Sequence, residues 1–231
     1  MGQRMEMRLT WQKRLKRIIF SRLIERIFLQ DKKSRVTRLS AQFVFSTYEN
    51  QPAAKLFHSR EHLWKSFGDT LGDSEWIGFE FGVASGDATR TFMKMPYAIN
   101  CLQWNGFDTF HGLPTPWGDL PKGAFSTDGN PPSIKNQIIN WHIGLIEETC
   151  TEINSLDHLD ENFIIIFDFD LYGATKTAWN VISKYLKTGD IIYFDEAYEI
   201  DESKIINEIL HSGLELGSLG YTTMGIAYKI I

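Results

Sequence analysis

Short apolar runs alternate with segments of helical spacing along most of the chain. The runs that predict buried strands are Trp76–Phe81, Leu102–Phe107, Ile138–Ile143, Phe163–Phe167, Ile191–Phe194 and, within Tyr221–Ile230, Ile226–Ile230. Helical spacing is found between them at Ala88–Met95 and Leu171–Lys187, and ahead of the first run at Lys55–Phe67. Strands that alternate with helices are typical of a parallel sheet covered by helices. The pattern therefore predicts an α/β fold with a doubly wound sheet.

Two of the predicted strands end in pairs of acids. Asp168-Phe169-Asp170 follows Phe163–Phe167, and Asp195-Glu196 follows Ile191–Phe194. A helical crossover makes such strands parallel, so their carboxyl ends open at one edge of the sheet, where open α/β sheets bind ligands. Carboxylates crowded there repel one another unless a cation neutralises them, which suggests a divalent metal ion. The alternative is that these acids cap loops and form salt bridges with lysine.

A glycine-containing turn follows the first strand, with the sequence Glu80-Phe-Gly-Val-Ala-Ser-Gly86. Gly82 permits a sharp turn and close approach to a ligand, and Gly86 relieves crowding where the next helix begins. The turn lacks the Gly-Lys-Ser/Thr of a P-loop, and Glu80 stands where the dinucleotide-binding pattern has its first glycine. An acid at that position suits a cationic amine better than a pyrophosphate. The alternative is a purely structural turn.

The second strand leads into Asp108, within Gly106-Phe-Asp-Thr-Phe-His-Gly-Leu-Pro114. An acid at the end of this strand in a doubly wound sheet usually binds ribose hydroxyls, and the alternative is that it caps a turn. The segment Gly112–Pro132 is rich in glycine and proline and has no periodicity. A long loop of this kind inside a compact domain is more often functional than idle.

The N-terminal residues differ from the rest in charge. Residues 1–40 hold twelve Lys and Arg against three Asp and Glu, a net charge of +9, and the remaining residues hold twelve against 26, a net charge of −14. Apolar residues at helical spacing predict an amphipathic helix at Thr10–Gln30, within a basic helical extension of residues 1–45 ahead of a domain of residues 46–231. This helix fits either an anionic membrane surface or packing against the body or a second subunit.

Composition limits the possible classes of protein. Apolar residues make up 43% of the chain and aromatic residues 13%, which supplies a substantial core and excludes global disorder. No apolar run approaches the roughly 20 residues of a membrane span, and basic residues interrupt the N-terminal segment where a secretory signal would lie. Cys101 and Cys150 show neither metal-binding spacing nor a disulfide pattern. We therefore expect a cytoplasmic protein, with peripheral membrane contact through the basic helix as an alternative setting.

Four stretches together resemble the class I S-adenosylmethionine-dependent methyltransferases, and more narrowly the macrocin O-methyltransferase-like group that acts on sugars and natural products. The stretches are Glu80–Gly86, Phe107–Pro114, Gly144–Thr149, and Asp168–Thr175 with Phe194–Glu196. They span about residues 60–231 and leave the basic extension uncovered. The resemblance implies a Rossmann-like, mostly parallel sheet of seven strands with helices on both faces.

The resemblance also implies roles for residues that match the motifs of the family. The S-adenosylmethionine would lie along Gly82, Val83, Ser85 and Gly86, with Glu80 facing its amino group, Asp108 its ribose, and Gly144 and Leu145 its adenine. In metal-dependent members, Mg²⁺ is held by acids at the positions of Asp168, Asp195 and Glu196. The last two are often both aspartate in the family, and a glutamate reaches one methylene further.

The implied reaction is coherent chemically. An alcohol is a poor nucleophile, and a bound divalent cation would lower its pKa and orient it for in-line attack on the sulfonium methyl. Asp168 would accept the proton, and His111 and His142 are the other candidates for the base. The expected acceptor is a small hydroxylated molecule such as a sugar, with no nucleic acid, and a homo-oligomer is an open option.

Two other functions compete with this interpretation. A metal-dependent nucleotide-sugar glycosyltransferase would also use an acid triplet such as Asp168-Phe169-Asp170, although it would not explain the turn at Glu80–Gly86 or the Asp108 segment. A non-catalytic protein of the same fold would bind a cofactor without transferring its methyl group.

Overall fold

The computed structural model describes residues 55–117, 120–157, 159–197, 199–222 and 224–231, without the side chain of residue 200. The basic extension of residues 1–45, including the helix expected at Thr10–Gln30, lies outside the described residues. Within these ranges, no helix has both the length and the apolar character that a membrane span requires.

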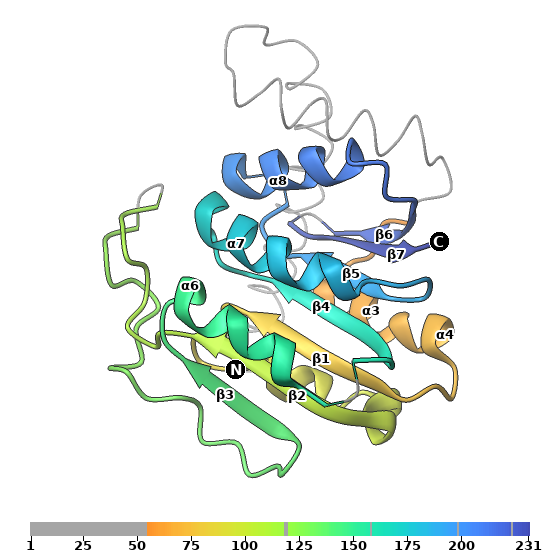
Figure 1. The fold of residues 1–231 in the computed structure, drawn as a ribbon, viewed down its shortest axis with the longest axis horizontal. Coiled ribbons are helices and arrows are strands. Elements are labelled where there is room, and N and C mark those ends of the chain that lie inside the picture. The colour runs from red at the N-terminus through yellow and green to blue at the C-terminus, as the bar shows by residue number, and fades with distance from the viewer. Residues whose placement is uncertain (1–54, 118–119, 158, 198, 223) are drawn as a thin grey trace, which may run out of the picture.

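Within the described residues, seven strands form one sheet in the order β3-β2-β1-β4-β5-β7-β6 (Figure 1). Their bounds are β1 Trp76–Phe81, β2 Cys101–Asp108, β3 Ile139–Ile143, β4 Asn162–Phe167, β5 Ile191–Phe194, β6 Leu216–Tyr221 and β7 Ile226–Ile230. Strands β1 to β5 pair in parallel, whereas β7 runs antiparallel to both β5 and β6. The prediction of a doubly wound, mostly parallel sheet is confirmed, and the final segment of the chain holds two strands.

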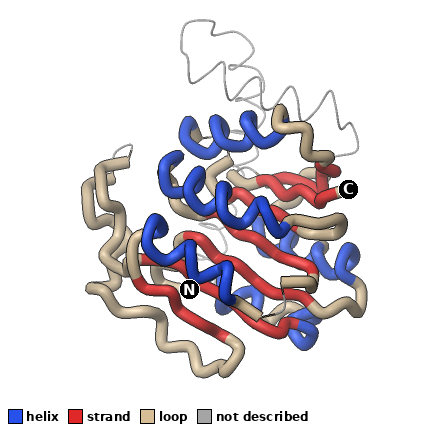
Figure 2. The backbone as a smooth tube through the Cα atoms, viewed as in Figure 1, coloured by secondary structure: helices blue, strands red, loops and turns tan. Residues whose placement is uncertain are grey.

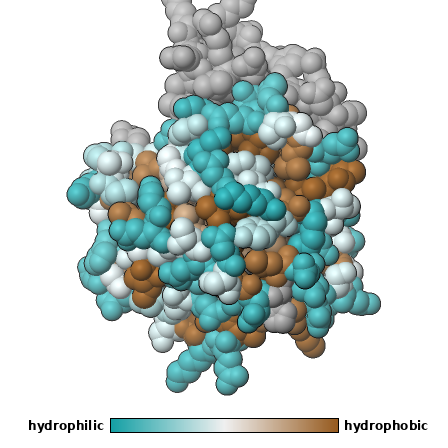
Figure 3. Space-filling view, viewed as in Figure 1, coloured by the Kyte–Doolittle hydropathy of each residue, from teal (hydrophilic) through white to brown (hydrophobic). Residues whose placement is uncertain are grey.

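Helices cover both faces of this sheet, as Figures 1 and 2 show. One face carries α6 Ile146–Thr149, α7 Tyr172–Ile182 and α8 Ile200–Leu210, and the other carries α3 Arg60–Lys65, α4 Phe67–Leu71 and α5 Asp87–Phe92. In the described part of the chain there are also three short 3-10 helices: η1 Pro96–Asn100, η2 Cys150–Ser155 and η3 Ser183–Tyr185. Each face buries its own hydrophobic cluster, because the central strands are apolar on both sides. Over the α6–α8 face, hydrophobic residues are interspersed with hydrophilic ones (Figure 3).

A row of stacked rings crosses five neighbouring strands on the face covered by α6, α7 and α8. It consists of His142, Phe107, Phe81, Phe167 and Phe194, which pair across the strands in register. Ring centroids along the row are 4.2, 5.0, 5.2 and 5.0 Å apart. Each such contact contributes about 0.5–1.5 kcal/mol beyond burial. Each ring belongs to the last or next-to-last residue of its strand, so the loops at the carboxyl edge begin directly beyond the row.

The helices differ more from their predicted ranges than the strands do. The predicted helix at Lys55–Phe67 is wrong in its first residues, because residues 55–59 are not helical and Leu56 pairs with Tyr221. The helix starts instead at Arg60, after Ser59, whose side chain accepts a hydrogen bond from the His62 amide. The helix expected at Leu171–Lys187 ends as α7 at Ile182 and continues as η3.

Candidate cofactor and active site

A cavity of about 770 Å³ opens at the carboxyl edge of the sheet. Loops after the five parallel strands line it, and it lies where β1 and β4 are neighbours although the chain has passed through β2 and β3 between them. Such a reversal of strand order is the usual ligand site of an open α/β sheet. The site residues therefore follow directly after the row of stacked rings.

The turn after β1 lies tightly against the end of β4. Gly82 has φ of 92°, and a Cβ built on it would overlap the backbone oxygen of Asp168. The amide of Gly82 donates to the carbonyl of Phe107 at 3.0 Å, and the amide of Asp168 donates to the carbonyl of Phe81 at 2.8 Å. Only glycine combines this backbone conformation with such close contact. The turn is thus fixed to both neighbouring strands.

Asp108 at the end of β2 holds this turn from the other side. Its Oδ2 accepts hydrogen bonds from the amides of Val83 and Ala84, both at 2.8 Å, and its Oδ1 accepts one from Phe110 at 2.7 Å. An ionised carboxylate has about four acceptor positions, so one remains for a ligand hydroxyl at the cavity that Asp108 lines. Asp108 can therefore cap the turn and also bind a ribose hydroxyl, so the two predicted alternatives do not exclude each other.

Glu80 lines the cavity and is 1% exposed. Its Oε2 accepts hydrogen bonds from the hydroxyl of Thr89 in α5 and from the indole of Trp104 in β2, the latter at 3.0 Å. Burial raises the pKa of Glu80 to about 8, and the hydrogen bonds from Thr89 and Trp104 limit that rise. A cationic group bound above it would favour its ionised form.

The other residues predicted to bind the cofactor are brought together with one exception. Val83, Ser85, Gly144 and Leu145 all line the cavity, the last two at the end of β3. Gly86 does not line it. It has φ of 78°, and a Cβ there would lie 2.7 Å from the Cγ of Pro132, so Gly86 serves the packing of the loop against the start of α5.

The acids after β4 and β5 are gathered as the sequence predicts. Asp168, Asp170, Asp195 and Glu196 all line the cavity. Burial of the Asp168 carboxyl group, followed by the charges of Asp195 and Asp170, raises its pKa well above the usual range. Burial and the charge of Asp195 likewise raise the pKa of Asp170 to about 6 and that of Glu196 to about 7. The cluster therefore favours protons or cations.

Among the described residues, no group of three His, Cys, Asp or Glu side chains is arranged to hold a metal ion. Oδ1 of Asp195 accepts a hydrogen bond from the Tyr193 hydroxyl, and Oδ2 of Asp195 lies 2.9 Å from Nη1 of Arg60. Oε2 of Glu196 is buried with no hydrogen-bond partner in the described part of the chain. The three predicted ligands thus lie near one another but do not fit Mg²⁺ in this arrangement.

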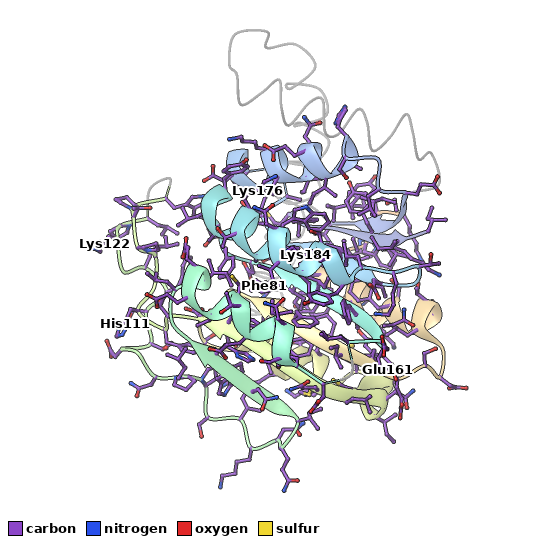
Figure 4. The ribbon with its side chains drawn as sticks, viewed as in Figure 1. Phe81, His111, Lys122, Glu161, Lys176 and Lys184 are labelled. Carbon is purple, nitrogen blue, oxygen red and sulfur yellow. The ribbon has the colours of Figure 1, made fainter. Side chains whose placement is uncertain are left out.

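The two candidate histidines lie outside the cavity lining. His142 ends the row of stacked rings, and its two ring nitrogens lie 2.6 Å from Oε2 of Glu152 and 3.2 Å from Oδ1 of Asn105. His111 is exposed on the loop after β2 that projects from the body (Figure 4). Of the three predicted catalytic residues, only Asp168 faces the cavity.

Several lining residues are not apparent from the sequence. Arg60 comes from α3, Phe125 from the long loop, and Asp201 from the start of α8. Glu202, the next residue in α8, is 1% exposed, and burial raises its pKa to about 8. The irregular composition of the segment Gly112–Pro132 signals the loop, whereas no sequence pattern marks Arg60 as a neighbour of an acid 135 residues away.

No protein-family model matches the sequence, and no curated protein is significantly similar to it. Solved structures are similar to it in fold. A crystal structure of CalS11, a calicheamicin methyltransferase, superposes with a TM-score of 0.57 and 19% identity over 90% of each chain. An apo structure of CalS11, a TDP-rhamnose 3'-O-methyltransferase, gives 0.52 and 20% over 86% of this chain and 96% of that one.

A third similar structure is MycE, a methyltransferase of the mycinamycin biosynthetic pathway in complex with Mg, SAH and mycinamycin VI. Its TM-score is 0.50 at 13% identity, over 86% of this chain and 55% of that one. At these identities the similarity establishes the fold. The chain has the Rossmann-like fold of the class I S-adenosylmethionine-dependent methyltransferases, and its cavity lies at the carboxyl edge of that fold.

Proposed function

We propose that this protein is an S-adenosylmethionine-dependent O-methyltransferase that methylates a hydroxyl of a sugar or of a sugar-bearing natural product. The observation that carries the proposal is that one cavity is lined both by Asp108, which accepts hydrogen bonds from the turn after β1, and by Asp168, a half-buried acid after β4. The first fits a nucleoside ribose, and the second fits a hydroxyl that must lose a proton.

The cofactor is proposed to lie across the ends of β1, β2 and β3. Its ribose hydroxyls would use the remaining acceptor position of Asp108, and its adenine would lie against Leu145, which is 46% exposed although apolar. Its ammonium group would lie toward Glu80, whose raised pKa falls when a cation binds nearby. This placement directs the sulfonium methyl toward the acids after β4.

Methyl transfer needs one base and in-line geometry. The acceptor O–H gives its proton to a carboxylate oxygen of Asp168, and the oxygen lone pair forms the new bond to the methyl carbon. The carbon–sulfur bond breaks at the same time, and its electron pair stays on sulfur, which converts the sulfonium to a neutral thioether. Because its pKa is raised, Asp168 in its ionised form holds the accepted proton more strongly than an ordinary aspartate does. Positioning of the two reactants supplies much of the remaining rate.

Two kinds of support favour a sugar hydroxyl as the methyl acceptor. The acid-rich wall offers carboxylates to the several hydroxyls of a sugar. Among the similar structures, CalS11 is named for methylation of TDP-rhamnose, and MycE is seen with mycinamycin VI. The predicted assistance by Mg²⁺ is not taken into the proposal, because Asp195 is already paired with Arg60 and the donor set does not fit the ion.

The test is methyl transfer from S-adenosylmethionine labelled with ¹³C at the methyl group. The protein is incubated with free sugars, nucleotide sugars and glycosylated natural products, and product methyl groups are read by two-dimensional NMR, which separates O-methyl from N-methyl signals. An O-methyl product that disappears in Asp168→Asn supports the proposal. Transfer of a sugar from a nucleotide sugar would support the glycosyltransferase instead, and cofactor binding without any product across the panel would support the non-catalytic alternative.

A further inference from the structure

Arg60 is built into the acid cluster by the packing of α3. Trp64, one helical turn after Arg60, is 1% exposed and packs edge-on against Tyr193 of β5, with ring centroids 5.4 Å apart. The hydroxyl of Tyr193 donates to Oδ1 of Asp195. Because residues four apart lie on one helix face, anchoring Trp64 on Tyr193 places Arg60 over Asp195.

The contacts of Arg60 fix its guanidinium at the cavity wall. Nη1 lies 2.9 Å from Oδ2 of Asp195, and Cζ lies 5.1 Å from the ring centroid of Trp64. Burial alone would lower the pKa of Arg60, but the charges of Asp195 and Asp168 outweigh it and raise the pKa. A guanidinium has five N–H donors, so donors beyond the one used by Asp195 remain for a ligand.

Arg60 is also the only cationic side chain among the described residues that line the cavity. Asp168, Asp170, Asp195 and Glu196 face the same space. A divalent ion bound by these acids would stand within a few ångströms of the guanidinium, and the two positive charges would repel each other in a partly desolvated site. The acids therefore accommodate one fixed cation, and the chain itself supplies it.

We propose that the guanidinium of Arg60 takes the position of a divalent metal ion, so that this methyltransferase works without one and Arg60 is the electrophilic partner of the acceptor hydroxyl. The part about the acceptor rests on the proposed function, whereas the part about the cation does not. In the transfer step, an N–H of Arg60 donates a hydrogen bond to the acceptor oxygen. At the same time, Asp168 accepts the proton of the acceptor hydroxyl. The positive charge stabilises the oxygen as it attacks the methyl carbon, and Arg60 neither gains nor loses a proton.

The direct test is a titration of Mn²⁺ followed by electron paramagnetic resonance, in which the signal of the free ion disappears when it binds. The wild-type protein is expected to leave the signal of equimolar Mn²⁺ unchanged. Arg60→Met removes the cation and keeps the aliphatic length, and it is expected to bind one Mn²⁺ per chain. Adding Asp195→Asn to Arg60→Met is expected to abolish that binding.

Lys176→Met is the matched control. Lys176 is not among the residues that line the cavity, and its Nζ lies 2.8 Å from Oε2 of Glu208 in an ion pair between α7 and α8 (Figure 4), so its removal is expected to leave Mn²⁺ binding at the wild-type level. Binding of S-adenosylhomocysteine by each variant shows that the fold is kept. If the wild-type protein does not bind S-adenosylhomocysteine, the proposed function is contradicted. The inference about Arg60 is not affected by that result, because the Mn²⁺ titration needs no cofactor.

Two results would overturn the inference. One is a wild-type protein that binds one Mn²⁺ per chain and loses it in Asp195→Asn. The other is an Arg60→Met protein that is folded and binds no more Mn²⁺ than the wild type does. Once an acceptor is known, methyl transfer after dialysis against EDTA is expected to stay within about twofold of its untreated rate.

Discussion

Oδ2 of Asp108 accepts a hydrogen bond from the amide of Val83 at 2.8 Å, so the acid at the end of β2 holds the turn that follows β1. Asp108→Ala removes this bond together with those from Ala84 and Phe110. Because it leaves three backbone donors without their acceptor, we expect the free energy of unfolding to fall by about 1–3 kcal/mol. The affinity for S-adenosylhomocysteine should fall about tenfold or more.

Urea unfolding and isothermal calorimetry measure the two effects of Asp108→Ala. Glu161→Gln is the control, since Glu161 precedes β4 at the opposite edge of the sheet (Figure 4). It should change neither quantity. Unchanged affinity in Asp108→Ala would remove Asp108 from the cofactor site and leave it the role of a turn cap.

Glu80→Gln is expected to change how stability depends on pH. The pKa of Glu80 is about 8 in the folded protein, above its ordinary value of 4.5, so the folded state holds a proton that the unfolded state has released between these values. Stability from this group is full below about pH 4.5 and declines as pH rises toward 8, with a slope of up to about 1.4 kcal/mol per pH unit. Glutamine keeps the acceptor for Thr89 and Trp104 and does not titrate.

The measurement is urea unfolding of both proteins between pH 5 and 8. As pH rises, the free energy of unfolding of Glu80→Gln should increase relative to that of the wild type. Comparing differences matters because Asp170, Glu196 and Glu202 also have raised pKa values and add the same slope to both proteins. A difference that does not vary with pH would show that Glu80 is ionised throughout.

Substitutions of the three candidate bases should have different effects on activity. Asp168→Asn removes the proton acceptor at the cavity and should lower kcat about a hundredfold or more, with little change in cofactor affinity. His111→Ala should leave kcat within about twofold, since His111 is exposed outside the cavity lining. His142→Gln should lower stability by loss of ring stacking on Phe107, while kcat stays near wild type. A large loss of kcat in His111→Ala would show that the loop closes over the substrate.

Two glycines at the cavity should respond oppositely to alanine. At Gly82, the positive φ and the overlap with the backbone of Asp168 predict that Gly82→Ala lowers stability by about 2–4 kcal/mol. At Gly173, in the first turn of α7, an added Cβ meets no atom within 4 Å, and alanine should raise stability by up to about 1 kcal/mol. Thermal unfolding of the two variants measures both effects. If Gly82→Ala and Gly173→Ala change stability equally, the turn after β1 must relax away from β4.

The strands could be predicted from the sequence because their burial leaves a simple pattern. β1 and β5 have the predicted bounds, since both strands are buried along their whole length, and a glycine follows β1 while two acids follow β5. The edge at which Asp168 and Asp195 meet followed from the crossover rule alone. These features depend on local sequence and general topology, so a single chain suffices to derive them.

Other features depend on contacts between distant residues. The α8 helix was not predicted, because the buried acid Glu202 interrupts its apolar face. His142 resembles a catalytic base in sequence, whereas its position in the row of stacked rings depends on the register between β2 and β3. The pairing of Arg60 with Asp195 depends on how α3 packs through Trp64, which no spacing in the sequence reveals.

The most direct test of the central claim is calorimetry with S-adenosylmethionine on the wild-type protein and on Leu145→Trp. Leu145 is exposed at the proposed adenine position, so an indole there should block the cofactor without disturbing the core. We predict one cofactor bound per wild-type chain with micromolar affinity, and a loss of at least about tenfold in the variant. No binding to the folded wild-type protein, or equal binding by both proteins, would contradict the proposed site.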